Sequence, residues 1–385
     1  MNRFRLTCVL LTLASLTTLS HAATSCKNEK NADVDWFFMY KLPRGAQDKH
    51  KVSIPSGDEY VYIDSTTPTS TPYWKLSTHT IFNGSNALAN TIAPLTAKQK
   101  PKNLAYVVYN DQPPIHLEDK TSSNGHTKGL FIFDEESGVW IIHSVPKFPE
   151  MLHHGFYTFP TNAREFGQTM LCVTFPTSQL ETIATHLRLQ YPNIYDSYAP
   201  ASLRKGRPAL NLLLNRKFIR EAPWILTASL KDVSNNPYIS FAKHGRYNRD
   251  VYSAAVASNL ESNLFASTWR NGAGGKVPAD CNYTYTVANV EALRLNMGKQ
   301  QLQIKNGEDH SKWAISEETA KRFVCIGTLN RMQSLSSGVV PRDWKVGKVI
   351  PIPKKAFPVP KRRTDAVLQE RPASQAAYEE RERVR

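Results

Sequence analysis

HTKGLFIFDEESGVWIIHS at residues 126–144 is matched 184 positions later by HSKWAISEETAKRFVCIGT at residues 310–328, and the two align without a gap. Both begin with a His-x-Lys triplet, carry an acid eight residues on, and end with an apolar run and a hydroxyl residue. A lone His-x-Lys triplet is weak evidence, because 48 of the 385 residues are Lys or Arg and such triplets arise by chance. The repeated combination predicts a site built from two similar halves.

The spacing inside each triplet fixes where its side chains lie. On a strand, residues i and i+2 share one face, so His126 lies beside Lys128, and His310 beside Lys312. A hairpin-like return follows each triplet and ends at the hydroxyl residue. These four basic side chains are therefore the candidate catalytic residues.

Two imidazoles and two ammonium groups around one point suit hydrolysis of a phosphodiester without a metal or any other cofactor. One histidine can attack phosphorus, and the second can protonate the leaving oxygen. Two lysines can supply the positive charge that a metal would otherwise provide. Hydrogen bonds to phosphate oxygens can come from the candidate supporting residues Ser144, Thr328 and Asn330.

Three further residues of the two copies have open roles. His143 either positions the site or fills a position in the core. Asp134 and Glu318 either orient a lysine or histidine or are acids of a turn. Asn330 has Pro146 as its counterpart at the same offset, so the two halves are not identical.

The first 23 residues are typical of a secretory signal, with two arginines, an apolar run at 6–19 and small residues at 20–23. That run is too short to span a bilayer, and no later segment approaches the ~20 apolar residues that a spanning helix needs. We expect a soluble mature protein without stable membrane insertion. Its destination is lysosomal or secreted, and its oligomeric state, monomer or homodimer, stays open.

The four cysteines that lie outside the signal fit an oxidising compartment. An even number favours two disulfides, with three possible connectivities, among Cys26, Cys172, Cys281 and Cys325. Two N-x-S/T triplets predict glycosylation, at Asn83 and Asn282.

The chain carries a formal net charge of +15 at pH 7, which favours polyanionic partners such as nucleic acid. Short β-branched and aromatic runs predict strands, at 35–42, 104–109, 129–133, 139–143, 168–175, 283–290, 312–315 and 323–326. Helices are expected at 178–190, where Ser178 and Glu181 form a capping box, and at about 251–264. Strands and helices in both halves favour an α/β class with mixed α+β character.

Six segments resemble the deoxyribonuclease II family of acid endonucleases: VDWFFMYKLP (34–43), YNDQPP (109–114), GHTKG (125–129), HSVPKFP (143–149), GQTMLCVTF (167–175) and EDHSKW (308–313). They lie far apart and together span almost the whole body of the chain. Gly327-Thr328-Leu329-Asn330 is also similar to the G-S-x-N element of the phospholipase D-like superfold.

The resemblance implies that superfold, in which two similar halves related by a pseudo-twofold axis bring both His-x-Lys motifs together and helices flank the strands. After the signal at 1–23, it implies a catalytic body at 24–345 with halves at about 24–195 and 196–345. Residues 346–385 form a charged tail that is not a typical feature of the family, and its composition predicts it to be disordered. The resemblance further implies a Cys26–Cys172 disulfide. Asp111 lies in a family-like segment, where a scaffold role is expected.

The implied activity is metal-independent hydrolysis of double-stranded DNA at acidic pH, without sequence preference, leaving 3′-phosphate and 5′-hydroxyl ends. By analogy with the superfold, His126 is the nucleophile that forms a phosphohistidine, and His310 is the general acid. Two alternatives remain, a lipid phosphodiesterase using the same four residues and a DNA-binding relative without catalysis. Lipid vesicles as substrate would test the first, and DNA binding without cutting would establish the second.

Overall fold

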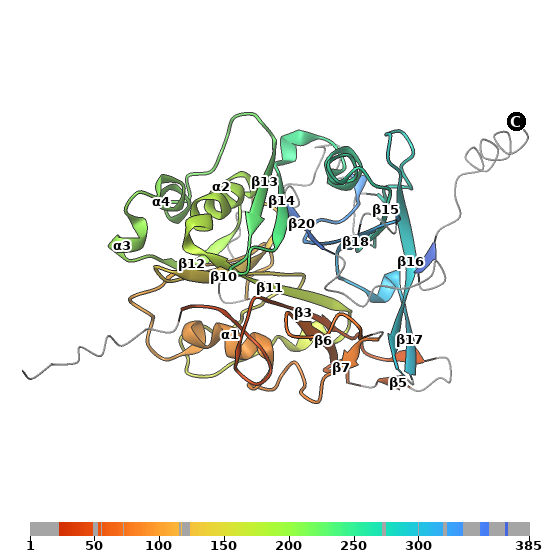
Figure 1. Cartoon of the computed structure of the whole chain (residues 1–385), viewed down its shortest axis with the longest axis horizontal. Coiled ribbons are helices and arrows are strands. Elements are labelled where there is room, and N and C mark those ends of the chain that lie inside the picture. Colours follow the sequence, from red (N-terminus) through yellow and green to blue (C-terminus); the bar gives the residue numbers. More distant parts are fainter. Residues whose placement is uncertain are drawn as a thin grey trace, which may run out of the picture.

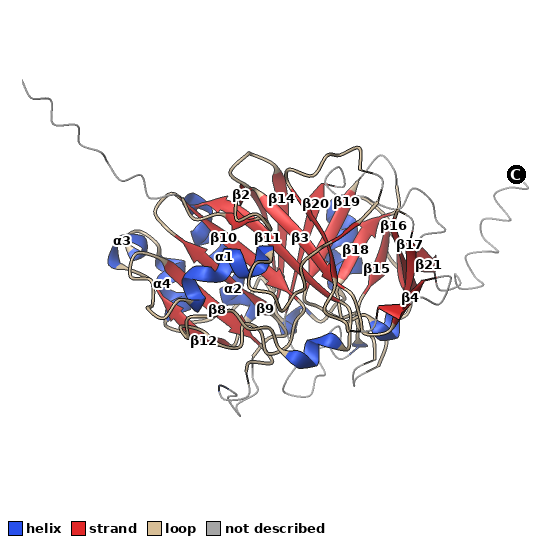
Figure 2. Ribbon diagram, turned by 90° about the horizontal axis from the view of Figure 1, so that it is seen from below, coloured by secondary structure: helices blue, strands red, loops and turns tan. Residues whose placement is uncertain are grey.

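Two large sheets and few helices make up the described part of this computed structural model (Figures 1 and 2). The described residues are 23–48, 53–54, 56–71, 73–114, 117, 124–271, 275–298, 300–318, 322–333, 347–353 and 366–368. None of the helices in these ranges is long and apolar enough to cross a membrane. The mixed α/β class expected from the sequence is confirmed.

The first sheet contains the first His-x-Lys copy. Its strand order is β12 (Ile194–Tyr198), β8 (Ala105–Asn110), β9 (Lys128–Phe133), β10 (Ser137–His143), β11 (Gln168–Pro176), β3 (Trp36–Lys41), β6 (Tyr60–Asp64) and β7 (Lys75–Leu76). All neighbouring strands in it run antiparallel. A separate pair, β1 (Cys26–Lys27) and β2 (Asp33–Val34), lies near the start of the described chain.

The second sheet contains the second copy. Its order is β13 (Ile225–Lys231), β14 (Pro237–Lys243), β20 (Gly347–Pro353), β19 (Phe323–Gly327), β18 (Trp313–Ser316), β15 (Leu264–Ser267), β16 (Val287–Met297), β17 (Gln300–Lys305), β4 (Ala46–Asp48) and β5 (Ser53–Ile54). The short strand β21 (Ala366–Leu368) also pairs with β16. Because β4 and β5 come from the N-terminal part of the chain, the first half contributes two strands to the second sheet.

The sequence repeat reappears as a repeat of strand pairing. In the β9–β10 hairpin Gly129 is opposite Ile142, and in the β18–β19 hairpin Trp313 is opposite Ile326, which preserves the 184-residue offset. Antiparallel strands flank both hairpins, β8 and β11 around the first and β15 and β20 around the second. The pseudo-twofold axis itself stays a prediction.

Helices cover both faces of the first sheet, which explains why its central strands are apolar throughout. Phe131 and Phe133 of β9 pack in one core with Leu187 of helix α2 (Leu180–Gln190). Leu130 and Ile132, which point the other way, pack in a second core with residues of helix α1 (Ala87–Thr96). Figure 1 shows α1 and α2 on opposite sides of these strands. Lys128 thus begins a fully buried strand, and His126 lies just before it.

Helix α2 lies where the sequence predicts it, but the predicted capping box is wrong. The Glu181 carboxylate accepts hydrogen bonds from the backbone N–H groups of Ala209 (2.6 Å) and Leu210 (3.2 Å), at the start of helix α4 (Pro208–Leu214). It therefore satisfies the terminus of a neighbouring helix instead of its own. A four-residue helix α3 (Ala201–Arg204) precedes α4.

The second predicted helix is shorter than expected. A π-helical segment, Tyr252–Ala257, runs into the short helix α5 (Ser258–Leu260), and the chain then enters β15. Strand β16 begins at Val287, four residues after its predicted start, and continues to Met297.

The prediction of a disordered tail from residue 346 differs from the structure at two segments, Gly347–Pro353 and Ala366–Leu368, which are β20 and β21. Strand β20 lies between β14 and β19 in the second sheet. The Pro- and Lys-rich composition hides a short apolar run whose partners are distant in sequence. Pro351 and Pro353 pair with Cys325 and Phe323 of β19 but lie beyond the part of β20 that pairs with β14, as expected for prolines at a strand edge. The remainder of the tail lies outside the described residues.

A disulfide joins Cys26 to Cys172, as the resemblance implied. It ties β1 to the centre of β11. Cys325 is a free thiol in the buried centre of β19, so the second disulfide that the even cysteine count favoured is not formed in the described part of the chain.

Candidate active site

His126 and Lys128 share one carboxylate, that of Asp111. His126 lies two residues before β9, and Lys128 is the first residue of that strand, opposite Asn110 at the end of β8. Asp111 follows immediately and therefore reaches both side chains. Its Oδ2 lies 2.6 Å from Nδ1 of His126, and its Oδ1 forms an ion pair with Nζ of Lys128. All three side chains are buried.

This arrangement fixes the orientation of the His126 ring. A carboxylate at Nδ1 keeps the proton of the neutral ring on that atom and leaves Nε2 as an acceptor. Nε2 lies 3.4 Å from Nδ2 of Asn330, an amide that can donate to it. Burial lowers the pKa of His126, Asp111 opposes that shift, and Lys128 adds to it. Burial acts to raise the pKa of Asp111, but the two cations outweigh it and hold that pKa well below its ordinary value.

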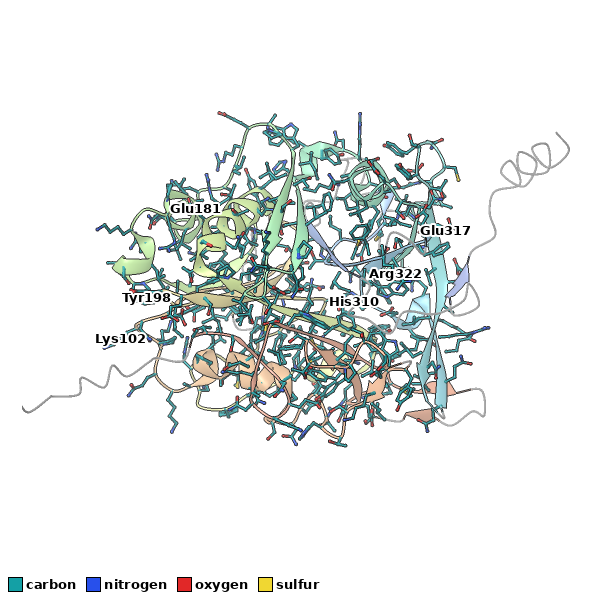
Figure 3. All side chains as sticks on the ribbon, viewed as in Figure 1. Lys102, Glu181, Tyr198, His310, Glu317 and Arg322 are labelled. Carbon is teal, nitrogen blue, oxygen red and sulfur yellow. A yellow bond between two sulfur atoms is a disulfide. The ribbon has the colours of Figure 1, made fainter. Side chains whose placement is uncertain are left out.

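His310 is half-buried and is held by the other half of the chain. Its Nδ1 lies 3.2 Å from the carbonyl oxygen of Ser144, the residue that ends the first copy, and its backbone N–H donates to the carbonyl of Gly167 (2.9 Å). Nζ of Lys312 lies 3.3 Å from the same Nδ1 and donates to the His310 carbonyl. Figure 3 labels His310 near the centre of the molecule.

Each candidate histidine therefore contacts the half of the chain that does not contain it. Asn330 contacts His126 across 204 positions, and Ser144 contacts His310 across 166. The two copies come together as the sequence repeat predicts, although the partners differ, an amide in one case and a carbonyl in the other.

The four basic side chains are close enough to influence one another's protonation. Burial lowers the pKa of His310 well below its usual value, and positive charge on Lys312, then Lys128, then His126 lowers it further. Burial also lowers the pKa of Lys312, and Lys128 adds to that shift. A cluster with more cations than nearby carboxylates is suited to bind an anion.

The supporting residues have mixed outcomes. The Ser144 hydroxyl donates to Oε1 of Gln168 (2.5 Å) and accepts from the N–H of Thr169 (3.0 Å), so it is engaged by β11, and the carbonyl of Ser144 contacts the site instead. Thr328 is buried at the end of β19. Oδ1 of Asn330 is buried and has no hydrogen-bond partner among the described residues, while its amide lies at His126.

His143 belongs to the core beside the site. Its Nδ1 accepts from the N–H of Val145 (3.2 Å), and its ring packs edge-on against Phe148, with centroids 5.3 Å apart. Burial, and then Lys128, lowers its pKa to about 3. A histidine that stays neutral at all ordinary pH values supports packing.

Asp134 and Glu318 are both turn acids. Oδ1 of Asp134 accepts from the N–H groups of Glu136 and Ser137, each at 2.8 Å, and Oδ2 accepts from Thr24. Glu318 accepts in the same way from Ser262 and from the N–H of Asn263 (3.3 Å). Each carboxylate ties its hairpin to a segment outside the hairpin, so neither orients a basic residue of the site.

Three residues beside the site were missed or misjudged from the sequence. Asp111, expected to be scaffold, is the counter-ion of the first motif. The rings of Trp269 and Phe166 lie 5.1 Å and 6.3 Å from that of His310. Asp111 and Trp269 each stand two residues beyond a residue that pairs beside a motif, Tyr109 opposite Gly129 and Ser267 opposite Trp313. This pairing is visible only in the structure.

Among the described residues, no group of three or more His, Cys, Asp or Glu side chains is arranged to hold a metal ion. The glycosylation candidates Asn83 and Asn282 are both exposed.

Comparison with known proteins gives consistent matches. A sequence model of the deoxyribonuclease II family matches residues 25–339. The chain is similar to plancitoxin-1 of Acanthaster planci, with 35% identity over 332 residues that cover 85% of this chain and 90% of that protein. It is also similar to deoxyribonuclease-2-alpha of Mus musculus, with 34% identity, 83% of this chain and 88% of that protein. A crystal structure of yeast tyrosyl-DNA phosphodiesterase covers 63% of this chain and 69% of its own, at 6% identity and a TM-score of 0.27, which is too low to support an argument.

Proposed function

Because the chain belongs to the deoxyribonuclease II family and is a hydrolase that acts on DNA, we propose that it cuts double-stranded DNA without a metal, at acidic pH, through a phosphohistidine intermediate. The observation that carries this proposal is the set of contacts made by the two ring nitrogens of His126. Its Nδ1 is held by Asp111, and its Nε2 faces an amide donor across the junction of the two halves. Such a ring presents an unprotonated nitrogen to whatever anion enters the site.

In the first step, Nε2 of His126 attacks phosphorus and the bond from phosphorus to the 5′ oxygen breaks. His310, protonated, donates its proton to that oxygen, which leaves as a 5′-hydroxyl. Lys128 and Lys312 offset the negative charge on the non-bridging oxygens. The Asn330 amide, already at Nε2, supports the same charge once the phosphoryl group is bound.

In the second step, the covalent phosphoryl group is hydrolysed. His310, now neutral, removes a proton from water, which attacks phosphorus and breaks its bond to Nε2. His126 returns to its starting state, and the product carries a 3′-phosphate. A carboxylate that keeps one proton on Nδ1 throughout leaves Nε2 free to attack phosphorus in the first step and to leave it in the second.

The electrostatics of His310 support an acidic optimum. A general acid must carry a proton. Because the pKa of His310 is lowered, its protonated form is populated only when the pH falls below the ordinary pKa of a histidine. A bound phosphodiester anion raises that pKa, so substrate and proton bind together. We propose the lysosome or the extracellular space as the destination, on the basis of the signal-like N-terminus and the exposed glycosylation triplets.

Plasmid nicking by the full secreted chain tests this proposal, measured from pH 4 to pH 8 in the presence of a chelator. We expect nicking that increases at acidic pH and is lost in His126→Ala and His310→Ala. End-labelling should find 3′-phosphate and 5′-hydroxyl ends, and reactions quenched with denaturant at alkaline pH should yield a peptide in which His126 is joined through phosphorus to the 3′ end of DNA. DNA binding without cutting at any pH, or cutting that the chelator abolishes, contradicts the proposal.

A further inference from the structure

Two aromatic side chains, those of Phe166 and Trp269, lie next to His310. The ring of Trp269 lies 5.1 Å from the imidazole of His310, and the rings of Phe166 and Trp269 meet edge to face at 4.8 Å. Both aromatic residues are half-buried. Aromatic surface left partly exposed beside a cationic site is available to a ligand.

The fold holds Phe166 in place through its neighbour. Gly167 donates from its N–H to the carbonyl of Glu308 (2.8 Å), and its carbonyl accepts from the N–H of His310 (2.9 Å). A Cβ at residue 167 would come within 2.8 Å of the Asp309 carboxylate and 2.5 Å of the Tyr40 hydroxyl, so glycine permits this close approach. These contacts fix Phe166 in space beside the start of the second His-x-Lys motif.

Trp269 is held just as firmly from the second sheet. It follows β15, and the carbonyl of Thr268 accepts from Nδ2 of Asn306 (3.1 Å), while the Thr268 hydroxyl accepts from the N–H of Arg331 (3.0 Å). By strand pairing Trp269 stands where Asp111 stands in the first half. One histidine therefore has a carboxylate beside it, and the other has an indole.

We infer that Phe166 and Trp269 form a stacking subsite for the nucleobase of the nucleotide that leaves with the 5′-hydroxyl. This inference rests on the proposed function, which assigns His310 to the 5′ oxygen. That oxygen belongs to the nucleotide on the 3′ side of the cut, so its base lies on the His310 side of the phosphate. Rigid aromatic faces suit this contact, because every base has a π face and stacking requires no sequence.

A duplex with one abasic nucleotide in a labelled strand tests the subsite within a single lane. The abasic site removes the base and keeps the charged backbone. With wild-type protein, cutting of the phosphodiester directly 5′ to the abasic nucleotide should fall on the order of 10-fold relative to neighbouring bonds. In Trp269→Leu and Phe166→Leu, cutting of base-bearing DNA should fall, and the difference between abasic and base-bearing bonds should largely disappear.

The ratio between bonds separates stacking from a structural role, because loss of folded enzyme lowers all bands alike. Phe156→Leu serves as the matched control, since Phe156 is 53% exposed and packs near His154; its ratio should equal that of the wild type. An unchanged ratio in Trp269→Leu overturns the inference while leaving the proposed function standing. A wild-type protein that cuts neither substrate contradicts the proposed function itself.

Discussion

Asp111 and Trp269 occupy equivalent places beside the two motifs, and this difference helps to give two like histidines unlike surroundings. A carboxylate at Nδ1 favours a ring that attacks through Nε2. An aromatic neighbour leaves the charge state of His310 to burial and to the nearby lysines. These unlike surroundings support the proposed division of labour between the two histidines.

Asp111→Asn should reduce kcat by about 10²–10⁴-fold while changing KM little, because the amide keeps the volume but no longer fixes the tautomer of His126. Steady-state cleavage of DNA near the optimum pH measures both constants. Asp196→Asn is a matched control, since Asp196 also contacts one histidine and one lysine, His153 (3.0 Å) and Lys100 (3.2 Å), away from the site. Equal loss in both variants would show that Asp111 acts only on folding.

His143 makes the folded state less stable as the pH falls. Its pKa is about 3 in the folded protein and about 6.5 in the unfolded chain, so between these values the unfolded state binds the extra proton. Stability is therefore lost as the pH drops below 6.5, by about 2 kcal/mol at pH 5.

His143→Asn removes this titration and keeps an acceptor for the N–H of Val145. The difference in unfolding free energy between pH 7 and pH 5, measured by urea denaturation, should shrink by about 2 kcal/mol. His79→Asn is the control, because His79 is not part of the buried core. An unchanged difference would mean that His143 is protonated in the folded protein.

At the scale of elements, Asp134 closes the turn of the β9–β10 hairpin and also reaches a separate segment. Asp134→Ala removes an acceptor from three N–H groups, those of Glu136, Ser137 and Thr24. We expect a loss of about 1–3 kcal/mol in unfolding free energy with kcat unchanged, because Asp134 contacts none of the four basic residues. Denaturation and cleavage assays on the same preparation check both parts. A fall in kcat with stability intact would restore Asp134 as a positioning residue.

The local sequence pattern predicted those strands whose own residues form a recognisable apolar run. Strands β3, β8, β9, β10, β11, β18 and β19 are short apolar runs between turn residues, and each lies close to its predicted range. The catalytic candidates were predictable because the repeat marks them twice. Asp111 and Trp269 were not, since their role depends on which strand pairs beside each motif, and that pairing joins residues far apart in sequence. Glu181 failed as a cap for the same reason: its partners lie on another helix.

At the scale of the whole molecule, the site exists only where the two halves meet. Asn330 reaches His126 from the end of β19, and Ser144 reaches His310 from the end of β10. The N–H of Gly327, the last residue of β19, also donates to the carbonyl of Lys312 (2.9 Å). Anything that loosens β19 therefore disturbs both candidate histidines at once, even from a distance.

Strand β20 is the most direct test of that dependence. It pairs with β19 from Phe323 to Gly327 and with β14 on its other edge, so removing it leaves two strands with unpaired backbone groups. A chain ending at residue 345 should unfold at lower urea concentration and lose most DNA cleavage. A chain ending at residue 368 keeps β20 and β21 and should retain both properties. If the chain ending at 345 is as stable and active as the full chain, β20 contributes nothing to the fold, and the tail is a dispensable extension, as its composition predicts.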